Sequence, residues 1–202
     1  MRLEIGIIAL VEEVLGVPAE RRARFDWLIN KPFVAHFGEH YPMILDLFEL
    51  LGGNREGLFA KADGYLVPDA YFPEPYHFIF EFDELQHFTA FRKETLGAYR
   101  EDFPLAFNRQ KYIQFCVKYE DAAIQKGSDR FRRKTADFQF ISGRAAQRAF
   151  FDTFRDLLPP LHGLRPTLRF AEFEVANILA GRLTGEAAKR CVHALLRQRH
   201  LI

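Results

Sequence analysis

The chain has 202 residues, 49% of them hydrophobic and 15% aromatic, with a formal net charge of +1. This size and composition support one sizeable domain with a full core and exclude an intrinsically disordered chain. The small net charge hides an uneven distribution, because residues 1–84 carry −8, residues 85–148 carry +6 and residues 149–202 carry +3. An acidic part followed by a basic part suits a metal centre beside a polyanion groove, and equally suits charge balance between two layers of a fold.

The two cysteines and the N-terminal segment help to predict the cellular compartment of the protein. Cys116 and Cys191 lie far apart without zinc-type spacing, so we expect buried thiols in a reducing compartment and a cytoplasmic location. The N-terminal apolar residues are interrupted by Glu4, Glu12 and Glu13. This stretch is therefore too short and too acidic for a signal peptide or a membrane span.

Apolar spacing and turn residues predict the elements of the first half of the chain. Helices are expected over 3–15, over about 20–29 and from Pro42 to Leu51, where Gly52-Gly53 ends the third one. One or two short strands are expected within 58–67, and a central strand over 77–83.

The second half reads mainly as helix. A helix over 89–99 has Thr89 as its cap, a long helix spans about 106–125, and Gly127-Ser128-Asp129 leads from it into a basic loop over 130–134. A helix over 143–158 is stopped by Pro159-Pro160, a last strand covers 167–170, and two short helices follow, the second starting near Thr184.

These elements predict an α/β fold, with α+β as the alternative, in which helices flank a small mixed central sheet. We expect a single domain over 1–202, with a helical N-terminal part over 1–53, a core over 54–172 and C-terminal helices over 173–202.

The strand at 77–83 places acids where an ordinary buried strand has none. Its aromatic face holds Phe78, Phe80 and Phe82, and its other face presents Glu81 and Asp83. Asp69 precedes them across a turn built on prolines. Buried carboxylates are unfavourable without a partner, and a divalent cation is a suitable one, so this region is a candidate metal site.

Pro68-Asp69 and Glu81-Phe82-Asp83 resemble the two half-motifs of the PD-(D/E)xK nuclease superfamily. The run from Ile79 to Phe88, with Gln86-His87 after the acids, resembles the variant of very-short-patch repair endonucleases and related uncharacterised domains. The resemblance covers roughly residues 58–115, with a weaker similarity at 167–170. It implies a restriction-endonuclease-like core.

The resemblance also implies a metal-dependent endonuclease that hydrolyses phosphodiester bonds of DNA. Asp69 and Glu81 would bind Mg²⁺ or Mn²⁺, which polarises the phosphate and helps to activate a water. Asp83 stands where most relatives carry Lys. Two explanations are open: Asp83 is a third metal ligand, or His87 or Gln86 orients the water or takes up its proton.

Basic residues after the motif are the expected nucleic-acid contacts, and DNA is favoured over RNA. They are Arg92, Lys93, Arg109, Lys111, Arg132, Arg133 and Lys134, with Arg130, Arg144 and Arg148 as further phosphate contacts. Arg144, Arg148, Asp152 and Arg155 form one helical stripe, for which the alternative is pairing within the stripe. No membrane partner is expected, and the oligomeric state is open, with a homodimer among the alternatives.

Two other interpretations compete with an active nuclease. Asp83 in place of Lys favours a nuclease-fold module that has lost catalysis and binds nucleic acid or a protein partner. In a purely structural protein, the acids would form salt bridges with Arg109 or Arg169. Carboxylates of Asp69 and Glu81 that converge on one point would support a site, whereas carboxylates on opposite faces would exclude one.

Overall fold

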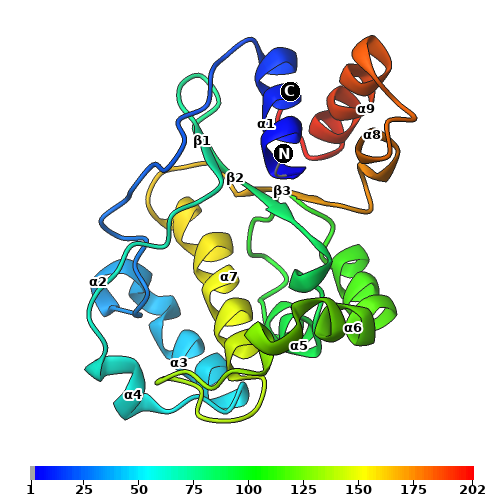
Figure 1. The fold of residues 1–202 in the computed structure, drawn as a ribbon. Helices are drawn as coiled ribbons and strands as arrows, with labels where there is room; N and C mark the ends of the chain where they lie inside the picture. The colour runs from blue at the N-terminus through cyan, green and yellow to red at the C-terminus, as the bar shows by residue number, and fades with distance from the viewer. Residues whose placement is uncertain (1–2) are drawn as a thin grey trace.

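The computed structural model describes residues 3–202, apart from the side chain of Ser128, and it is a mixed α/β structure (Figure 1). The helices are α1 (Leu3–Leu15), α2 (Val34–Phe37), α3 (Tyr41–Leu50), α4 (Arg55–Ala60), α5 (Ala90–Gly97), α6 (Arg109–Arg132), α7 (Gly143–Leu161), α8 (Ala176–Leu179) and α9 (Gly185–Gln198). The strands are β1 (Ala70–Phe72), β2 (Phe78–Asp83) and β3 (Leu168–Ala171), and short 3₁₀ turns cover Gly38–His40 and Leu85–His87.

The three strands form one sheet in the order β1-β2-β3. β1 runs antiparallel to β2, with Ala70 opposite Phe80, and β3 runs parallel to β2, with Arg169 opposite Glu81. A parallel pair needs a long crossover, and here α5, α6 and α7 provide it. The central strand β2 is buried along its whole length.

Successive side chains of β2 point to opposite faces of the sheet, and the aromatic face and the acidic face lie where the sequence predicts. Phe78, Phe80 and Phe82 pack in an apolar cluster with residues of α1 and α9, which lie side by side over that face of the sheet (Figure 1). Ile79 belongs to a second cluster, formed with α3, α5, α6 and α7 on the opposite face. Glu81 therefore faces the helical layer that contains α7.

The N-terminal elements differ from prediction in two places. Residues 20–29 form no helix, because Glu20 exchanges two backbone hydrogen bonds with Tyr71 at the edge of β1, at 2.7 and 2.9 Å. Arg22 adopts a left-handed φ of 62°. Residues 58–67 hold no strand, since Asn54 accepts a hydrogen bond from the amide of Gly57 at 2.6 Å and starts α4.

Two helices run further than their sequence signals predict. α6 continues through Gly127 to Arg132, and a Cβ added to Gly127 would lie 2.2 Å from the ring of Phe131. Gly127 thus permits close packing inside the helix, and residues 130–132 are helical rather than part of a loop. α7 includes Pro159 and Pro160 and ends at Leu161. The helices expected at 3–15, 42–51 and 89–99 are confirmed, with Thr89 capping the last one.

Over residues 3–202, none of the helices has the combined length and apolar character that crossing a bilayer requires.

Candidate functional site

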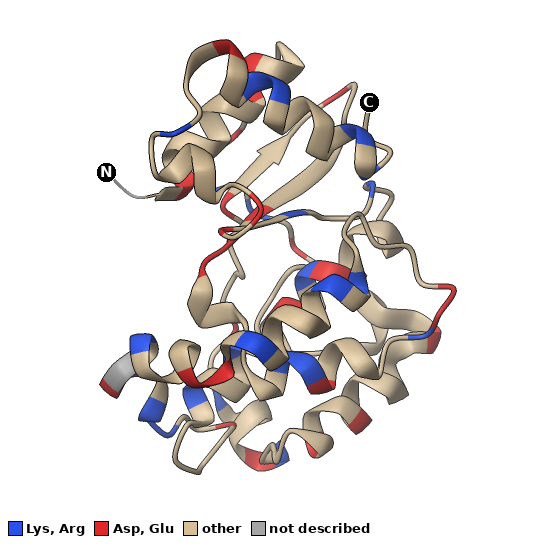
Figure 2. Ribbon diagram, turned by 90° about the vertical axis from the view of Figure 1, so that its right-hand side faces the viewer, with Lys and Arg blue, Asp and Glu red and all other residues tan. Residues whose placement is uncertain are grey.

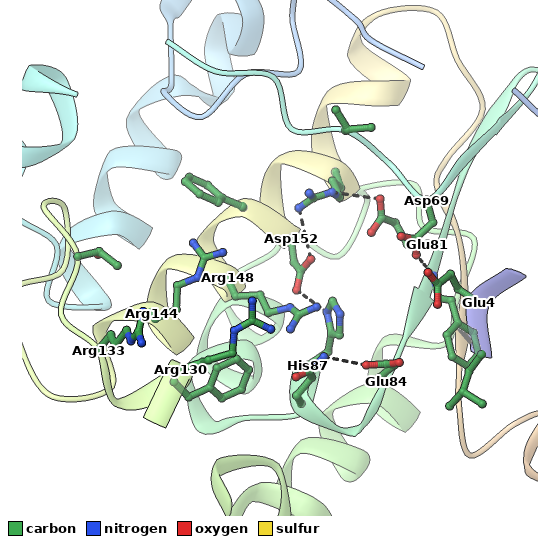
Figure 3. Close-up of a pocket in the computed structure, with 18 of the residues that line it drawn as sticks. Glu4, Asp69, Glu81, Glu84, His87, Arg130, Arg133, Arg144, Arg148 and Asp152 are labelled. Atoms are coloured by element: carbon green, nitrogen blue, oxygen red, sulfur yellow. Dashed lines mark hydrogen bonds and ion pairs between the residues drawn. The ribbon is translucent and has the colours of Figure 1, made fainter. Parts of the chain in front are cut away.

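A cavity of about 970 Å³ lies between the start of α1, the ends of β1 and β2, and the helices α6 and α7. Its acidic residues are Glu4, Asp69, Glu81, Glu84 and Asp152, and its basic residues are Arg130, Arg133, Lys134, Arg144, Arg148 and Arg155. The strand acids lie on one side and Arg130, Arg133, Arg144 and Arg148 on the other, with His87 and Asp152 between them (Figure 3). Lys and Arg also gather at the C-terminal end of α6, at the lower left of Figure 2.

Asp69, immediately before β1, and Glu81, on β2, line this cavity together. Asp69 Oδ2 accepts a hydrogen bond of 2.8 Å from the backbone amide of Phe82, so the start of β1 is fastened to β2. Glu81 is 5% exposed, and its Oε1 lies 3.1 Å from Nε of Arg155. Both of these atoms are buried without a hydrogen bond among the described residues, so the contact is an ion pair without hydrogen-bond geometry.

Burial and proximity both disfavour the ionised forms of these acids. Burial raises the pKa of Glu81 to about 8; Arg155 opposes the shift and the charge of Asp69 adds to it. Burial also raises the pKa of Asp69, against the lowering effect of its hydrogen bond to Phe82 and of the charges of His87 and Arg155. Two carboxylates that repel each other in a buried place are stabilised by a cation.

Asp83 does not line the cavity, although it follows Glu81 on the same strand face. Its Oδ1 accepts a hydrogen bond of 2.6 Å from Nη1 of Arg169, and both side chains are almost fully buried. Arg169 also contacts Asp156 from Nε, at 2.6 Å, and Asp152 from Nη2, at 3.5 Å. The salt bridge to Arg169, which was one alternative, therefore forms for Asp83.

His87 lies at the edge of the cavity and is oriented by two acids through one ring nitrogen. Its Nδ1 is 3.0 Å from Oδ2 of Asp152 and 3.2 Å from Oδ1 of Asp83. Burial alone would raise the pKa of Asp152, but the charges of His87 and Arg169, together with the hydrogen bond to His87, hold it well below its ordinary value. Gln86 also lines the cavity, where its Nε2 donates to Glu84 at 2.8 Å.

Only some of the expected nucleic-acid contacts reach the cavity. Arg133 and Lys134 line it, whereas Arg132 is exposed but outside its lining. Lys93 lies on α5 within 3.9 Å of Glu94, also away from the cavity.

Three further basic residues that were predicted to contact nucleic acid instead bind other groups of the protein, away from the cavity. Arg92 is 2% exposed and binds Asp156 at 2.7 Å, so it is a core residue rather than a nucleic-acid contact. Arg109 donates to the carbonyl oxygen of Tyr99 at 2.7 Å, and Lys111 binds Glu174 at 2.9 Å.

The helical stripe of α7 is the part of the site that the sequence left undecided. Arg144, Arg148, Asp152 and Arg155 all line the cavity, and the last of these pairs with Glu81 on β2 as well as lying 3.7 Å from Asp152. Their spacing showed that they share one helix face, but which element this face packs against depends on the tertiary fold.

Two of the three expected ligand residues fit a divalent cation, and the third does not. Glu81 Oε1 is buried without a hydrogen bond, and Asp69 uses only Oδ2 in its contact to Phe82. Both supply the oxygen atoms that Mg²⁺ or Mn²⁺ prefers. Asp83, expected as the third ligand, is bound to Arg169 instead. Over residues 3–202, no three His, Cys, Asp or Glu side chains gather in a way that could hold a metal, so water or a phosphate oxygen would have to complete the coordination.

Comparison with known proteins places this site within a family. No curated protein and no solved structure matches the chain. A family model described as a family of unknown function (DUF7255) matches residues 46–183, which include Asp69, Glu81, His87 and the whole of α7. Because this match covers more than half of the chain, the protein belongs to the DUF7255 family.

Proposed function

We propose that the chain is a metal-dependent nuclease that hydrolyses phosphodiester bonds of DNA. The observation that carries the proposal is the shared cavity, in which Asp69 and Glu81 face a wall of cations from α6 and α7. Carboxylates alone would repel a phosphate, and cations alone would only bind it. Their combination suits a site that holds a phosphodiester and a divalent cation together.

In this proposal Asp69 and Glu81 hold Mg²⁺ or Mn²⁺. When bound, the cation would polarise a phosphate oxygen and lower the pKa of a coordinated water. Arg155 already reaches Glu81 and lines the cavity, so its guanidinium can move onto the phosphate once Glu81 has another cationic partner. There it would stabilise the negative charge that develops on the phosphate oxygens.

His87 is the proposed acceptor of the proton from the attacking water. Asp152 and Asp83 both approach Nδ1, so the proton on that nitrogen is fixed and Nε2 carries the free lone pair. None of the described residues makes a hydrogen bond to Nε2. An imidazole held in this way has Nε2 placed to accept the proton of an attacking water.

The test is cleavage of plasmid and oligonucleotide DNA with Mg²⁺ or Mn²⁺, comparing the wild type with Asp69→Asn and Glu81→Gln. We expect both substitutions to abolish cleavage. Asp46→Asn, which changes an exposed carboxylate on α3, is the matched control and should retain it. Cleavage that survives both site substitutions would show that the nuclease activity does not belong to this cavity.

A catalytically inactive module that binds nucleic acid is the second candidate function. The ion pair between Asp83 and Arg169 favours it, because the position where the resembling nucleases carry a lysine is used here for folding. In that case DNA would bind in a salt-sensitive manner with no cleavage under any divalent cation.

A further inference from the structure

The cavity has a third feature besides its acids and cations, namely apolar side chains around its lining. We propose that the substrate is single-stranded DNA, which enters the cavity as an unpaired strand. This inference rests on the proposed function and specifies its substrate. It follows from the depth of the carboxylates, the position of the unpaired cations and the apolar residues beside them.

The depth of the carboxylates favours one strand over two. Glu81 is 5% exposed and Asp69 is partly buried, so a scissile phosphate must pass below the surface to reach them. The cavity, at about 970 Å³, is of the size that encloses a small ligand, about 300–1,000 Å³. An unpaired strand brings only its own backbone and bases into such a space. A duplex phosphate arrives with a second strand and a rigid base stack, which would have to fit against the same cavity.

The cationic wall supplies a track for one backbone. Arg130, Arg133, Lys134 and Arg148 line the cavity, and none of them has a carboxylate partner within residues 3–202. Arg144 and Arg148 lie one helical turn apart on α7, where two like charges repel each other. Such an arrangement is unfavourable in the free protein and becomes favourable when phosphates lie between the cations.

One of these cations is held in place by a chain of buried polar groups. Nζ of Lys61 lies 2.5 Å from Oδ2 of Asp137, whose Oδ1 accepts a hydrogen bond of 2.6 Å from Nε2 of Gln147. The Oε1 of Gln147 then accepts a hydrogen bond from Nη1 of Arg144. Asp137 is fully buried, so this chain fixes the guanidinium of Arg144 beside the cavity before any ligand arrives.

The apolar lining provides contacts that only unpaired bases can use. Leu3 and Val67 line the cavity although they are 41% and 36% exposed, and the partly exposed ring of Phe151 joins them. Unpaired bases can pack their faces on the two aliphatic side chains and stack on the ring of Phe151, over which Nζ of Lys61 lies 4.8 Å from the ring centroid. In a duplex those faces are stacked inside the helix. A positive track with an aromatic ring beside it is typical of a single-strand site, and Phe151 supplies such a ring here.

The test measures binding without cleavage, by fluorescence anisotropy in EDTA. A short labelled DNA strand of mixed sequence is compared with a blunt hairpin duplex of the same sequence. We expect the single strand to bind at least about tenfold more tightly, as base-face contacts predict. In Arg144→Gln/Arg148→Gln, we expect single-strand affinity to fall and the slope of log K against log salt to shrink by about 1.4, for two lost phosphate contacts. Arg190→Gln/Arg197→Gln, on the exposed side of α9, is the charge-matched control and should change neither.

The possible outcomes separate this inference from the proposed reaction. Duplex binding that equals or exceeds single-strand binding would overturn the inference, and metal-dependent duplex cleavage would then leave the nuclease proposal standing. Tight single-strand binding without cleavage under any divalent cation would support the inference and overturn the reaction. An unchanged salt slope in Arg144→Gln/Arg148→Gln would show that the strand does not bind along this wall of the cavity, and would overturn the inference.

Discussion

The guanidinium of Arg169 donates from Nη1 to Oδ1 of Asp83 over 2.6 Å, at a place where both side chains are almost fully buried. β2 and β3 are parallel neighbours, and this contact ties their acidic and basic side chains together beneath α7. Asp156 and Asp152 of α7 complete the surroundings of the same guanidinium. Asp83 thus belongs to the ionic core that joins the sheet to α7, while Glu81, two residues earlier, faces the cavity.

Disrupting this ionic core should destabilise the protein. Arg169→Ala leaves buried carboxylates without their cation, and we expect a loss of about 3–5 kcal/mol in the free energy of unfolding. Asp83→Lys should be at least as damaging, because it places an ammonium group against Arg169. Urea unfolding followed by circular dichroism measures both, with the exposed Arg182→Ala as the control. A stable, active Asp83→Lys protein would contradict the role given to this pair.

Glu81 should make the stability of the protein depend on pH. Its pKa is raised to about 8 in the folded state and lies near 4.5 in the unfolded chain. Between these values the folded state binds a proton that the unfolded state has lost, so stability falls as pH rises from about 4.5 to about 8. Glu81→Gln removes this dependence. Thermal unfolding in EDTA at several pH values should show Glu81→Gln gaining stability over the wild type toward pH 8, and a constant difference would refute the assignment.

Divalent cations should stabilise the wild type through the same two carboxylates. A ligand that binds only the folded state raises the free energy of unfolding. The increase is about 1.4 kcal/mol for each factor of ten by which the ligand concentration exceeds the dissociation constant. We expect MgCl₂ or MnCl₂ to raise the melting temperature of the wild type and of Asp46→Asn, but not that of Asp69→Asn. Equal shifts in all three proteins would indicate a general salt effect instead of a site at Asp69.

The sequence predicted those parts of the fold and site that depend on local spacing. The alternation Phe78, Phe80, Phe82 identified the apolar face of β2, and the position of Glu81 on the other face followed directly. The stripe of Arg144 and Arg148 was visible as one helix face. Residues 20–29 were assigned wrongly, because Glu20 pairs with Tyr71 at the edge of β1 and Ile29 pairs with Tyr65, both far away in the sequence.

Contacts between distant segments could not be predicted from spacing. Asp83 and Arg169 are 86 positions apart, and His87 and Asp152 are 65 positions apart. The first pair depends on the pairing of β3 beside β2, and the second depends on how the β2–β3 crossover positions α7 over the sheet. The sequence supplied Arg169 as one partner for the acids but gave no means of choosing which acid it would bind. Arg92 was misplaced for the same reason, since only the fold brings Asp156 to it.

Arg155 should matter for cleavage more than for stability. It is the cation nearest to Glu81 and lines the cavity, and removing one group that stabilises transition-state charge typically lowers kcat by about 10²–10³. We expect this loss in Arg155→Met and partial recovery in Arg155→Lys, which keeps the charge but not the planar fork. Steady-state kinetics on DNA measures both. An effect on KM alone would make Arg155 a binding residue without a role in the chemical step.

His87 and Asp152 should behave as one unit in the reaction, because Asp152 fixes the ring nitrogen that faces away from the proposed water. His87→Gln should lower kcat by about 10²–10⁴, the range for removal of a general base. Asp152→Asn should also lower kcat, and the double substitution should lower it little further, since each single change already disables the pair. The pKa of Asp152 is held well below its ordinary value, so its ionised form stabilises the fold above the unfolded pKa of about 4. This stability is lost as pH falls through the folded pKa, and the deficit of Asp152→Asn should therefore be large at neutral pH and shrink in acid. Additive losses in kcat from the two single substitutions would show that the two residues act separately.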